Sequence, residues 1–172
     1  RESTYQGEKM NHNFYVIDSS SLMQLNRSNP IDVFLTVWKK LEGLVNNGTL
    51  LAPKEVFYEI QEGDDQLTQW TKKQKKMFVE PTPKQIEIVK DILSKYPAIV
   101  KEDRKYDADP WIIALAVELS KSSQTTLFPV KRIVVTEERL RGSQIKIPFV
   151  CQKYNIEAIN IVDMFRLEGW KF

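Results

Sequence analysis

Apolar residues along this chain of 172 residues alternate between short unbroken runs and longer series with helical spacing. The short runs predict buried strands at 14–17, 49–52, 133–135 and 156–161. Helical spacing and end signals predict helices at 31–45, 53–60, 67–78, 82–96, 109–119 and 163–168. Because helices separate the strands, we expect right-handed crossovers and a mainly parallel central sheet with helices on both faces. The sequence therefore predicts an α/β chain with a three-layer α/β/α architecture.

Polar residues mark where several of these elements begin and end. Asp18 and the three serines after it predict a turn that closes the first strand. Asp109 followed by Pro110 predicts an N-cap and a first-turn proline for the 109–119 helix, which is apolar on nearly all sides and is expected to be buried. Residues 61–106 contain the predicted helices 67–78 and 82–96 and show no strand signature, and we expect them to form a helical insertion.

Composition and length indicate one globular domain. Hydrophobic residues make up 42% and charged residues 28% of the chain, which excludes disordered and low-complexity classes. The first nine residues are polar and precede Met10, so we interpret 1–13 as a tag remnant with a short lead-in. Residues 14–172 are then a single domain.

Cysteine and histidine are nearly absent, with one of each at Cys151 and His12. This scarcity excludes an internal disulfide, zinc sites built on these residues, Ser-His-Asp hydrolysis and Cys-His proteolysis. Any metal must then have oxygen ligands, which favours Mg²⁺, Mn²⁺ or Ca²⁺. The longest wholly apolar run, 111–117, is far shorter than the roughly 20 residues of a membrane-spanning helix. We therefore expect a cytoplasmic protein with no membrane partner.

Acidic residues follow the predicted strands at the positions where ligands bind. In an open parallel sheet, ligands bind beyond the carboxyl ends of the strands. Asp18 ends the first strand, and Glu59 lies on the short helix after the second. Glu138 follows the third strand and Asp109 opens the buried helix. Clustered carboxylates repel one another unless a cation compensates them, so their joint placement predicts an Mg²⁺ or Mn²⁺ site suited to phosphodiester hydrolysis.

Each acid also has an ordinary structural interpretation. Asp109 caps a helix in any case, and Asp18 can make a turn with the serines beside it. Glu59 and Glu138 are compatible with solvated surface positions. The individual signals are therefore unspecific, and the hypothesis depends on their convergence.

Four motifs in the same order resemble those of the PIN domain. They are VIDSSSL near the start, P-x-x-V-x-x-E at 53–59, D-x-x-x-x-A-x-A at 109–116 and VVTEE at 134–138. The resemblance covers almost the whole chain from Phe14, and the segments ADPWIIALA and IPFVCQKYNI resemble a prokaryotic branch. It implies a PIN-like fold, a metal-dependent nuclease, and a relation to the toxin ribonucleases of toxin-antitoxin pairs.

The resemblance also implies roles for individual residues. Asp18, Glu59 and Asp109 match the three acidic positions of the family, and Glu138 stands where the fourth acid is usually aspartate. All four are expected to be catalytic and to bind the metal. The residues beside them that we expect to support these acids are Ser20, Thr136 and Asp107.

The leading hypothesis is an Mg²⁺- or Mn²⁺-dependent endoribonuclease acting on RNA, most simply single-stranded. The family resemblance implies RNA as the substrate. It also implies an antitoxin partner and a homodimer. Trp70 is a candidate contact of the homodimer unless it lies in the core. The expected phosphate contacts are Arg132, Arg139, Arg141 and Lys146, with the lysines of 72–76 as a weaker candidate.

Two rivals stay open on the sequence. One is a catalytically inactive PIN-like module that binds RNA or protein. The other is a phosphate-transferring protein with Asp18 as nucleophile, like haloacid dehalogenase phosphatases or response-regulator receivers. The sequence disfavours this second rival. A haloacid dehalogenase phosphatase needs an acid where this chain has Ser20, and a response-regulator receiver needs acids before the strand end, where the segment 14–17 has none.

Overall fold

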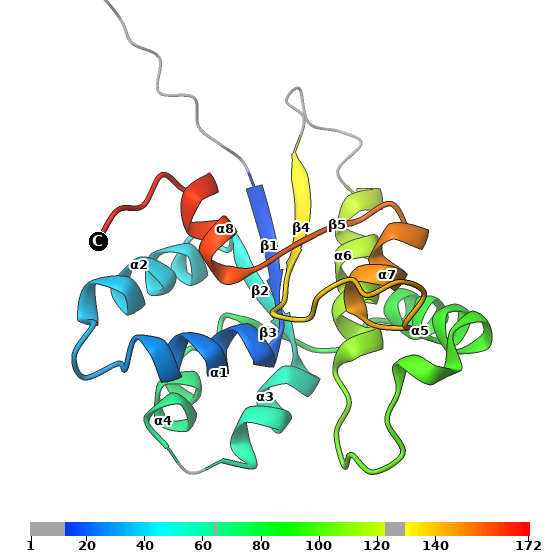
Figure 1. The fold of residues 1–172 in the computed structure, drawn as a ribbon, viewed down its shortest axis with the longest axis horizontal. Helices are drawn as coiled ribbons and strands as arrows, with labels where there is room; N and C mark the ends of the chain where they lie inside the picture. The colour runs from blue at the N-terminus through cyan, green and yellow to red at the C-terminus, as the bar shows by residue number, and fades with distance from the viewer. Residues whose placement is uncertain (1–12, 64, 123–129) are drawn as a thin grey trace, which may run out of the picture.

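A five-stranded parallel sheet lies at the centre of the computed structural model, which describes residues 13–63, 65–122 and 130–172 (Figure 1). Its strands are β1 (Asn13–Ile17), β2 (Leu50–Pro53), β3 (Phe78–Val79), β4 (Lys131–Val135) and β5 (Glu157–Ile159). The strand order is β3-β2-β1-β4-β5, and every pairing is parallel. The α/β class and the parallel sheet predicted from the sequence are confirmed.

Helices cover both faces of the sheet (Figure 1). On one side lie α1 (Ser19–Ser28), α2 (Leu35–Asn46), α4 (Gln66–Lys73) and α8 (Ile161–Leu167). On the other lie α5 (Pro83–Lys95), α6 (Asp109–Ser122) and α7 (Ile147–Lys153). The helix α3 (Lys54–Gln61) follows β2, and a short 3-10 helix spans Pro97–Ile99. The three-layer architecture is therefore confirmed.

The core lies where β1, β4 and α6 meet. Residues 15–17 of β1 and 133–135 of β4 are fully buried, and so are Ile112, Ile113 and Ala114 of α6. Strands of a parallel sheet that is covered on both faces read as continuous apolar runs, which is why these two segments were detectable in the sequence. The prediction that the 109–119 helix is buried is confirmed.

Three elements differ from the sequence prediction. Phe78, which we assigned to a helix, lies in β3, a two-residue edge strand within the predicted helical insertion, so the expectation of no strand there is wrong. The serines after Asp18 begin α1 rather than a turn, because the carbonyl of Asp18 accepts hydrogen bonds from the amides of Ser21 and Leu22. The helix α7 was not predicted.

Two smaller predictions have separate outcomes. Trp70, named as a candidate dimer contact or core residue, is a core residue: it is buried, and its ring packs edge-to-face on Trp38 with centroids 5.0 Å apart. Asn13, assigned to the lead-in, belongs to β1, whereas Met10 and the rest of 1–12 lie outside the described residues. Within the described ranges, no helix is long and apolar enough to cross a membrane.

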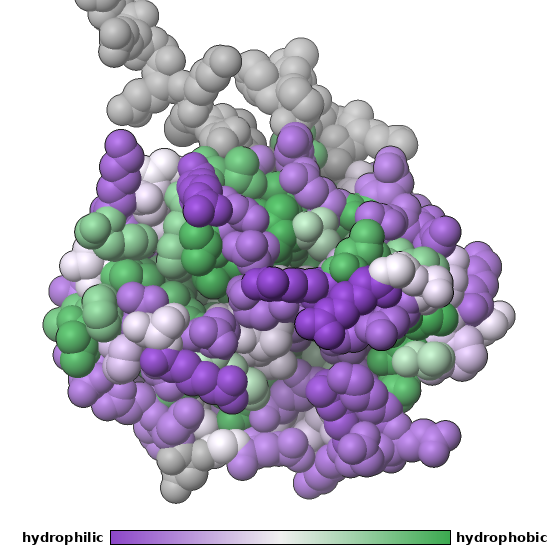
Figure 2. All heavy atoms as spheres, viewed as in Figure 1, coloured by the Kyte–Doolittle hydropathy of each residue, from purple (hydrophilic) through white to green (hydrophobic). Residues whose placement is uncertain are grey.

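The visible surface of one face is mostly hydrophilic (Figure 2). Its most hydrophilic area lies over the loop between β4 and α7, which carries the exposed residues Arg139 and Arg141. Apolar side chains appear at the turn between α1 and α2, where Val33, Phe34 and Leu35 are exposed.

Candidate metal site

The carboxyl ends of the strands point toward α3, and the four predicted acids lie at this edge (Figure 1). Asp18 directly follows β1, and Glu138 lies three residues after β4. Glu59 lies on α3 and Asp109 begins α6. All four line one pocket of about 250 Å³. The expected convergence of these acids is therefore present in the structure.

Asp18 is held in place by hydroxyl groups from two parts of the chain. Asp18 is 3% exposed. Its Oδ2 accepts hydrogen bonds from Ser20 Oγ at 2.5 Å and from Thr136 Oγ1 at 2.9 Å. The same hydroxyl oxygens accept bonds from the amides of Glu137 and Glu138. The loop after β4 is thereby joined to Asp18 and to the start of α1.

Glu59 connects α3 to both α1 and α6. Its Oε2 accepts a hydrogen bond from Ser19 Oγ at 2.5 Å, and its Oε1 accepts one from the backbone amide of Ala108 at 2.9 Å. Burial raises the pKa of Glu59, and the charge of Asp18 raises it further, while these two hydrogen bonds oppose the shift. Glu59 is thus positioned by segments that lie about forty and fifty residues away.

Asp109 does not have the capping role that the sequence predicts. It is the first residue of α6, and the amides at this end bond instead to other carboxylates: Ala108 to Glu59, and Asp109 to Oδ1 of Asp107 at 3.3 Å. Burial raises the pKa of Asp109 to about 8, and the charges of four neighbouring carboxylates add to the shift. Its carboxylate is therefore available to the pocket rather than committed to the helix end.

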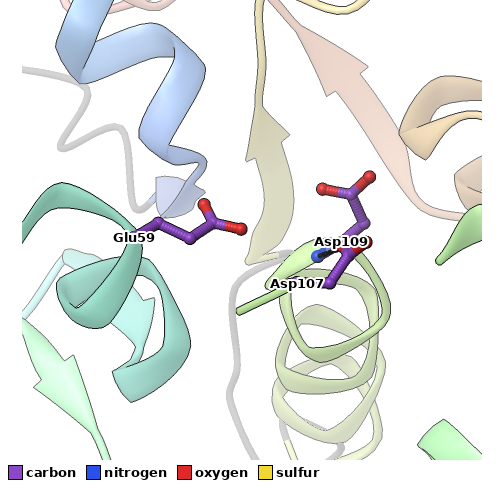
Figure 3. A group of neighbouring side chains, drawn as sticks. All are labelled: Glu59, Asp107 and Asp109. Carbon is purple, nitrogen blue, oxygen red and sulfur yellow. Dashed lines mark hydrogen bonds between the residues drawn. The ribbon is translucent and has the colours of Figure 1, made fainter. Parts of the chain in front are cut away.

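Asp107 supports the start of α6. Its Oδ2 accepts a hydrogen bond from the amide of Lys101 at 2.8 Å, and its Oδ1 bonds to Asp109. One oxygen from each of Glu59, Asp107 and Asp109 lies within 4.8 Å of the other two (Figure 3). Figure 3 shows Glu59 reaching from α3 toward the start of α6, where the two aspartates lie. These three residues have the spacing needed to share one metal ion.

Glu138 reaches the pocket and also anchors α7. Its Oε2 accepts a hydrogen bond from the amide of Ile147 at 2.9 Å, at the first residue of that helix. The negative charge of Glu138 contributes to the raised pKa of both Asp18, whose shift is caused mainly by burial, and Asp109. The glutamate is therefore electrostatically coupled to the other acids.

The predicted phosphate contacts do not form one group. Arg132 lies near the amino end of β4, roughly 13 Å along the strand from Thr136 at about 3.3 Å per residue, and its guanidinium lies over the ring of Phe14. The prediction that Arg132 binds phosphate beside the acids is not supported by this placement. Arg139 lines a neighbouring pocket that also includes Glu138. Arg141 is exposed and Lys146 half-buried, and neither lines the carboxylate pocket.

Sequence reasoning missed several residues of the carboxylate pocket. The six lining residues other than the four acids are Ser19, Ser20, Met23, Glu62, Arg104 and Tyr106, of which only Ser20 was expected. Arg104 is the cation among them, and its charge lowers the pKa of Glu59 against the larger effect of burial. Arg104 belongs to a segment, 100–108, without periodic apolar spacing, so no sequence signal pointed to it.

The donor set fits a hard dication. Five carboxylates line the described pocket and no histidine or cysteine does, and such an oxygen-rich set is the preference of Mg²⁺ and Mn²⁺. The raised pKa values of Asp18, Glu59 and Asp109 indicate that burial and mutual repulsion disfavour the charged carboxylates. A bound cation would relieve both effects.

Comparison with known proteins identifies one family. The profile of a domain of unknown function, DUF4411, matches residues 15–172. None of the curated proteins matches the chain.

Proposed function

We propose that this chain, which belongs to the DUF4411 family, is an Mg²⁺- or Mn²⁺-dependent endoribonuclease with a PIN-like active site. The observation that carries the proposal is the convergence of Asp18, Glu59, Asp109 and Glu138 on one pocket at the carboxyl edge of a parallel sheet. The resemblance of the four motifs around these acids to the PIN domain supports RNA as the substrate.

The acids of the pocket would hold the metal, with Asp107 contributing to the same group. When bound, a dication lowers the pKa of a water molecule and neutralises the charge that develops on a phosphoryl group. The hydroxyls of Ser19, Ser20 and Thr136 orient two of the carboxylates and keep them from rotating. Arg104 offers the pocket a cation for a substrate phosphate.

The overall reaction is hydrolysis of a phosphodiester. An oxygen of water bonds to phosphorus, the bond between phosphorus and the leaving ribose oxygen breaks, and one proton of the water reaches that oxygen. The chain's contribution is positioning and charge stabilisation rather than covalent catalysis. We propose a cytoplasmic location, as expected from the sequence. The toxin role, the antitoxin and the homodimer stay predictions from the resemblance.

A cleavage assay with Asp18→Asn tests the proposal. The protein is stripped with EDTA and supplied with Mn²⁺ or Mg²⁺ and an end-labelled single-stranded RNA. We expect cleavage that depends on the metal and falls by more than about 100-fold in the variant, because loss of an accessory partner alone costs about 10- to 100-fold. The matched control is Asp32→Asn, an exposed aspartate outside the pocket, which should cleave like the wild type.

Calorimetric titration with Mn²⁺ distinguishes the proposal from an inactive binding module. A nuclease should bind Mn²⁺ in the wild type, bind it more weakly in Asp18→Asn, and cut RNA in parallel. If RNA binds but neither form cuts it with either metal, the chain is a binding module and the catalytic proposal is wrong.

A further inference from the structure

A second pocket lies on the other side of α3 and is strongly basic. It has a volume of about 470 Å³. Its six lining residues are Lys54, Phe57, Thr71, Lys72, Lys75 and Phe78. We call it the lysine pocket. Half of its lining is lysine and none is acidic, whereas the carboxylate pocket has five acids and a single arginine.

The three lysines differ in whether another described residue pairs with them. Lys54 forms an ion pair with Glu80. Lys72 and Lys75 are exposed, and within the described part of the chain neither has an ion-pair partner. Their charges are therefore available to an anion from solution.

The lysine pocket also has aromatic walls. The half-buried rings of Phe57 and Phe78 pack edge-to-face with centroids 5.1 Å apart. Aromatic side chains beside lysines are the combination that binds single-stranded nucleic acid, because bases stack on the rings while the ammonium groups neutralise phosphates. A carboxylate peptide or a free phosphate would need only the lysines.

Aromatic residues connect this pocket to the carboxylate pocket over α3. Phe57 contacts Tyr58 at 6.0 Å between centroids, and Tyr58 stacks on Tyr106 at 5.2 Å. Tyr106 lines the carboxylate pocket, and Tyr58 is 37% exposed. On the helical wheel, at 3.6 residues per turn, Tyr58 falls between Phe57 and Glu59, which line different pockets. The chain of rings therefore crosses the exposed ridge of α3.

We propose that the lysine pocket is a second binding site for the single-stranded RNA substrate, which passes from the carboxylate pocket across the rings of Tyr106 and Tyr58. The path of the RNA from the carboxylate pocket to the lysine pocket rests on the proposed function. Binding of RNA to the lysine pocket requires no catalysis. The two pockets flank one helix, whose diameter with side chains is about 10–12 Å. At about 3.4 Å per stacked nucleotide, roughly three nucleotides would bridge them.

Binding measurements without metal test this site. A fluorescein-labelled oligouridylate of twelve nucleotides is titrated with protein in EDTA, and anisotropy is followed at several salt concentrations. We expect the Lys72→Gln/Lys75→Gln double variant to bind more weakly, with a salt slope smaller by about 1.4, since each phosphate contact to a single strand contributes about 0.7. The matched control is Lys39→Gln/Lys90→Gln, which removes two exposed lysines outside the pocket.

Phe57→Leu tests the stacking component while keeping an apolar side chain. We expect about tenfold weaker binding with an unchanged salt slope, because one stacked base is lost and no phosphate contact is. Circular dichroism confirms that each variant is folded. An unchanged salt slope in the lysine double variant, or unchanged affinity in folded Phe57→Leu, overturns the proposal.

The result is separable from the test of catalysis. If Asp18→Asn and the wild type are equally inactive but the lysine variant loses RNA binding, the lysine pocket stands and the nuclease proposal fails. If the wild type cuts RNA and the lysine variant binds it like the control, the nuclease proposal stands and the lysine pocket fails.

Discussion

The hydroxyl of Ser19 donates a 2.5 Å hydrogen bond to Oε2 of Glu59, a residue forty positions later in the chain. The same hydroxyl lies 3.3 Å from Oδ1 of Asp18. It carries one proton, so it can fully satisfy only one of the two carboxylates at a time. Ser19 therefore lies between two of the proposed metal ligands and sets their relative orientation.

Replacing Ser19 with alanine should weaken metal binding. Ser19→Ala removes the donor that opposes the raised pKa of Glu59 and leaves this carboxylate free to rotate. We expect the Kd for Mn²⁺, measured by calorimetry, to rise by about 10- to 100-fold. Saturating Mn²⁺ should restore most of the cleavage rate, whereas it should not rescue Asp18→Asn. Unchanged Mn²⁺ affinity would show that Ser19 has only a local structural role.

Replacing Arg104 should affect the substrate rather than the metal. Its guanidinium belongs to an exposed residue on the wall of the carboxylate pocket, where a substrate phosphate would approach. For Arg104→Gln we expect the KM for RNA to rise about fivefold, equivalent to about 1 kcal/mol, with little change in kcat. Mn²⁺ affinity should not fall, because the variant removes a positive charge. Arg27→Gln on α1, outside this pocket, is the control, and an equal fall in kcat and metal affinity would contradict the assignment.

Metal-free protein should become less stable as the pH rises. The pKa of Asp109 is about 8 in the folded chain and near 3.8 when unfolded. Between pH 3.8 and about 8, the folded state keeps a proton on Asp109 that the unfolded state has released. The stabilisation that Asp109 contributes is therefore fully present below pH 3.8 and is lost as the pH rises through about 8. At about 1.4 kcal/mol for each pH unit between the two pKa values, the loss is at most about 6 kcal/mol.

Denaturant unfolding in EDTA at pH 5.5, 7 and 8.5 measures this effect. Asp109→Asn removes the titration, so the difference in stability between this variant and the wild type should grow with pH in the variant's favour. Asp32→Asn should track the wild type. Added Mn²⁺ should stabilise the wild type most at high pH. If the difference in stability between Asp109→Asn and the wild type does not change with pH, the prediction is wrong.

Two substitutions of Glu138 should separate its structural role from its electrostatic role. Glu138→Gln keeps an oxygen that can accept the bond from the amide of Ile147 but removes the charge, whereas Glu138→Ala removes both. We expect the glutamine variant to keep its Tm and lose activity, and the alanine variant to lose about 1 kcal/mol of stability as well. Thermal unfolding and the cleavage assay check this. Full activity in the glutamine variant would leave Glu138 as an anchor of α7 alone.

The parts of the fold that could be predicted from sequence are those in which burial dictates residue type. The central strands and α6 are apolar because the sheet is covered on both sides, and acids at the carboxyl ends of parallel strands converge for topological reasons. The edge strand β3 has two residues, too few to show a period, and its pairing with β2 is tertiary.

The supporting contacts of the site could not be predicted in the same way. Glu59 bonds to the amide of Ala108, and Thr136 bonds to Asp18 across 118 positions. Such contacts depend on how loops meet after the sheet has formed, and nothing local in the sequence encodes them. The capping prediction for Asp109 failed for the same reason, because carboxylates from other positions occupy that helix end.

The pairing of β1 with β4 has a consequence for the newborn polypeptide. Asp18 is held by Thr136, which a ribosome translating about 5–20 residues per second reaches roughly 6–24 s later. Until β4 has emerged and docked, the first acid lacks its partner and the cleft is unfinished. The carboxylate pocket therefore cannot be complete before about three quarters of the chain has been synthesised.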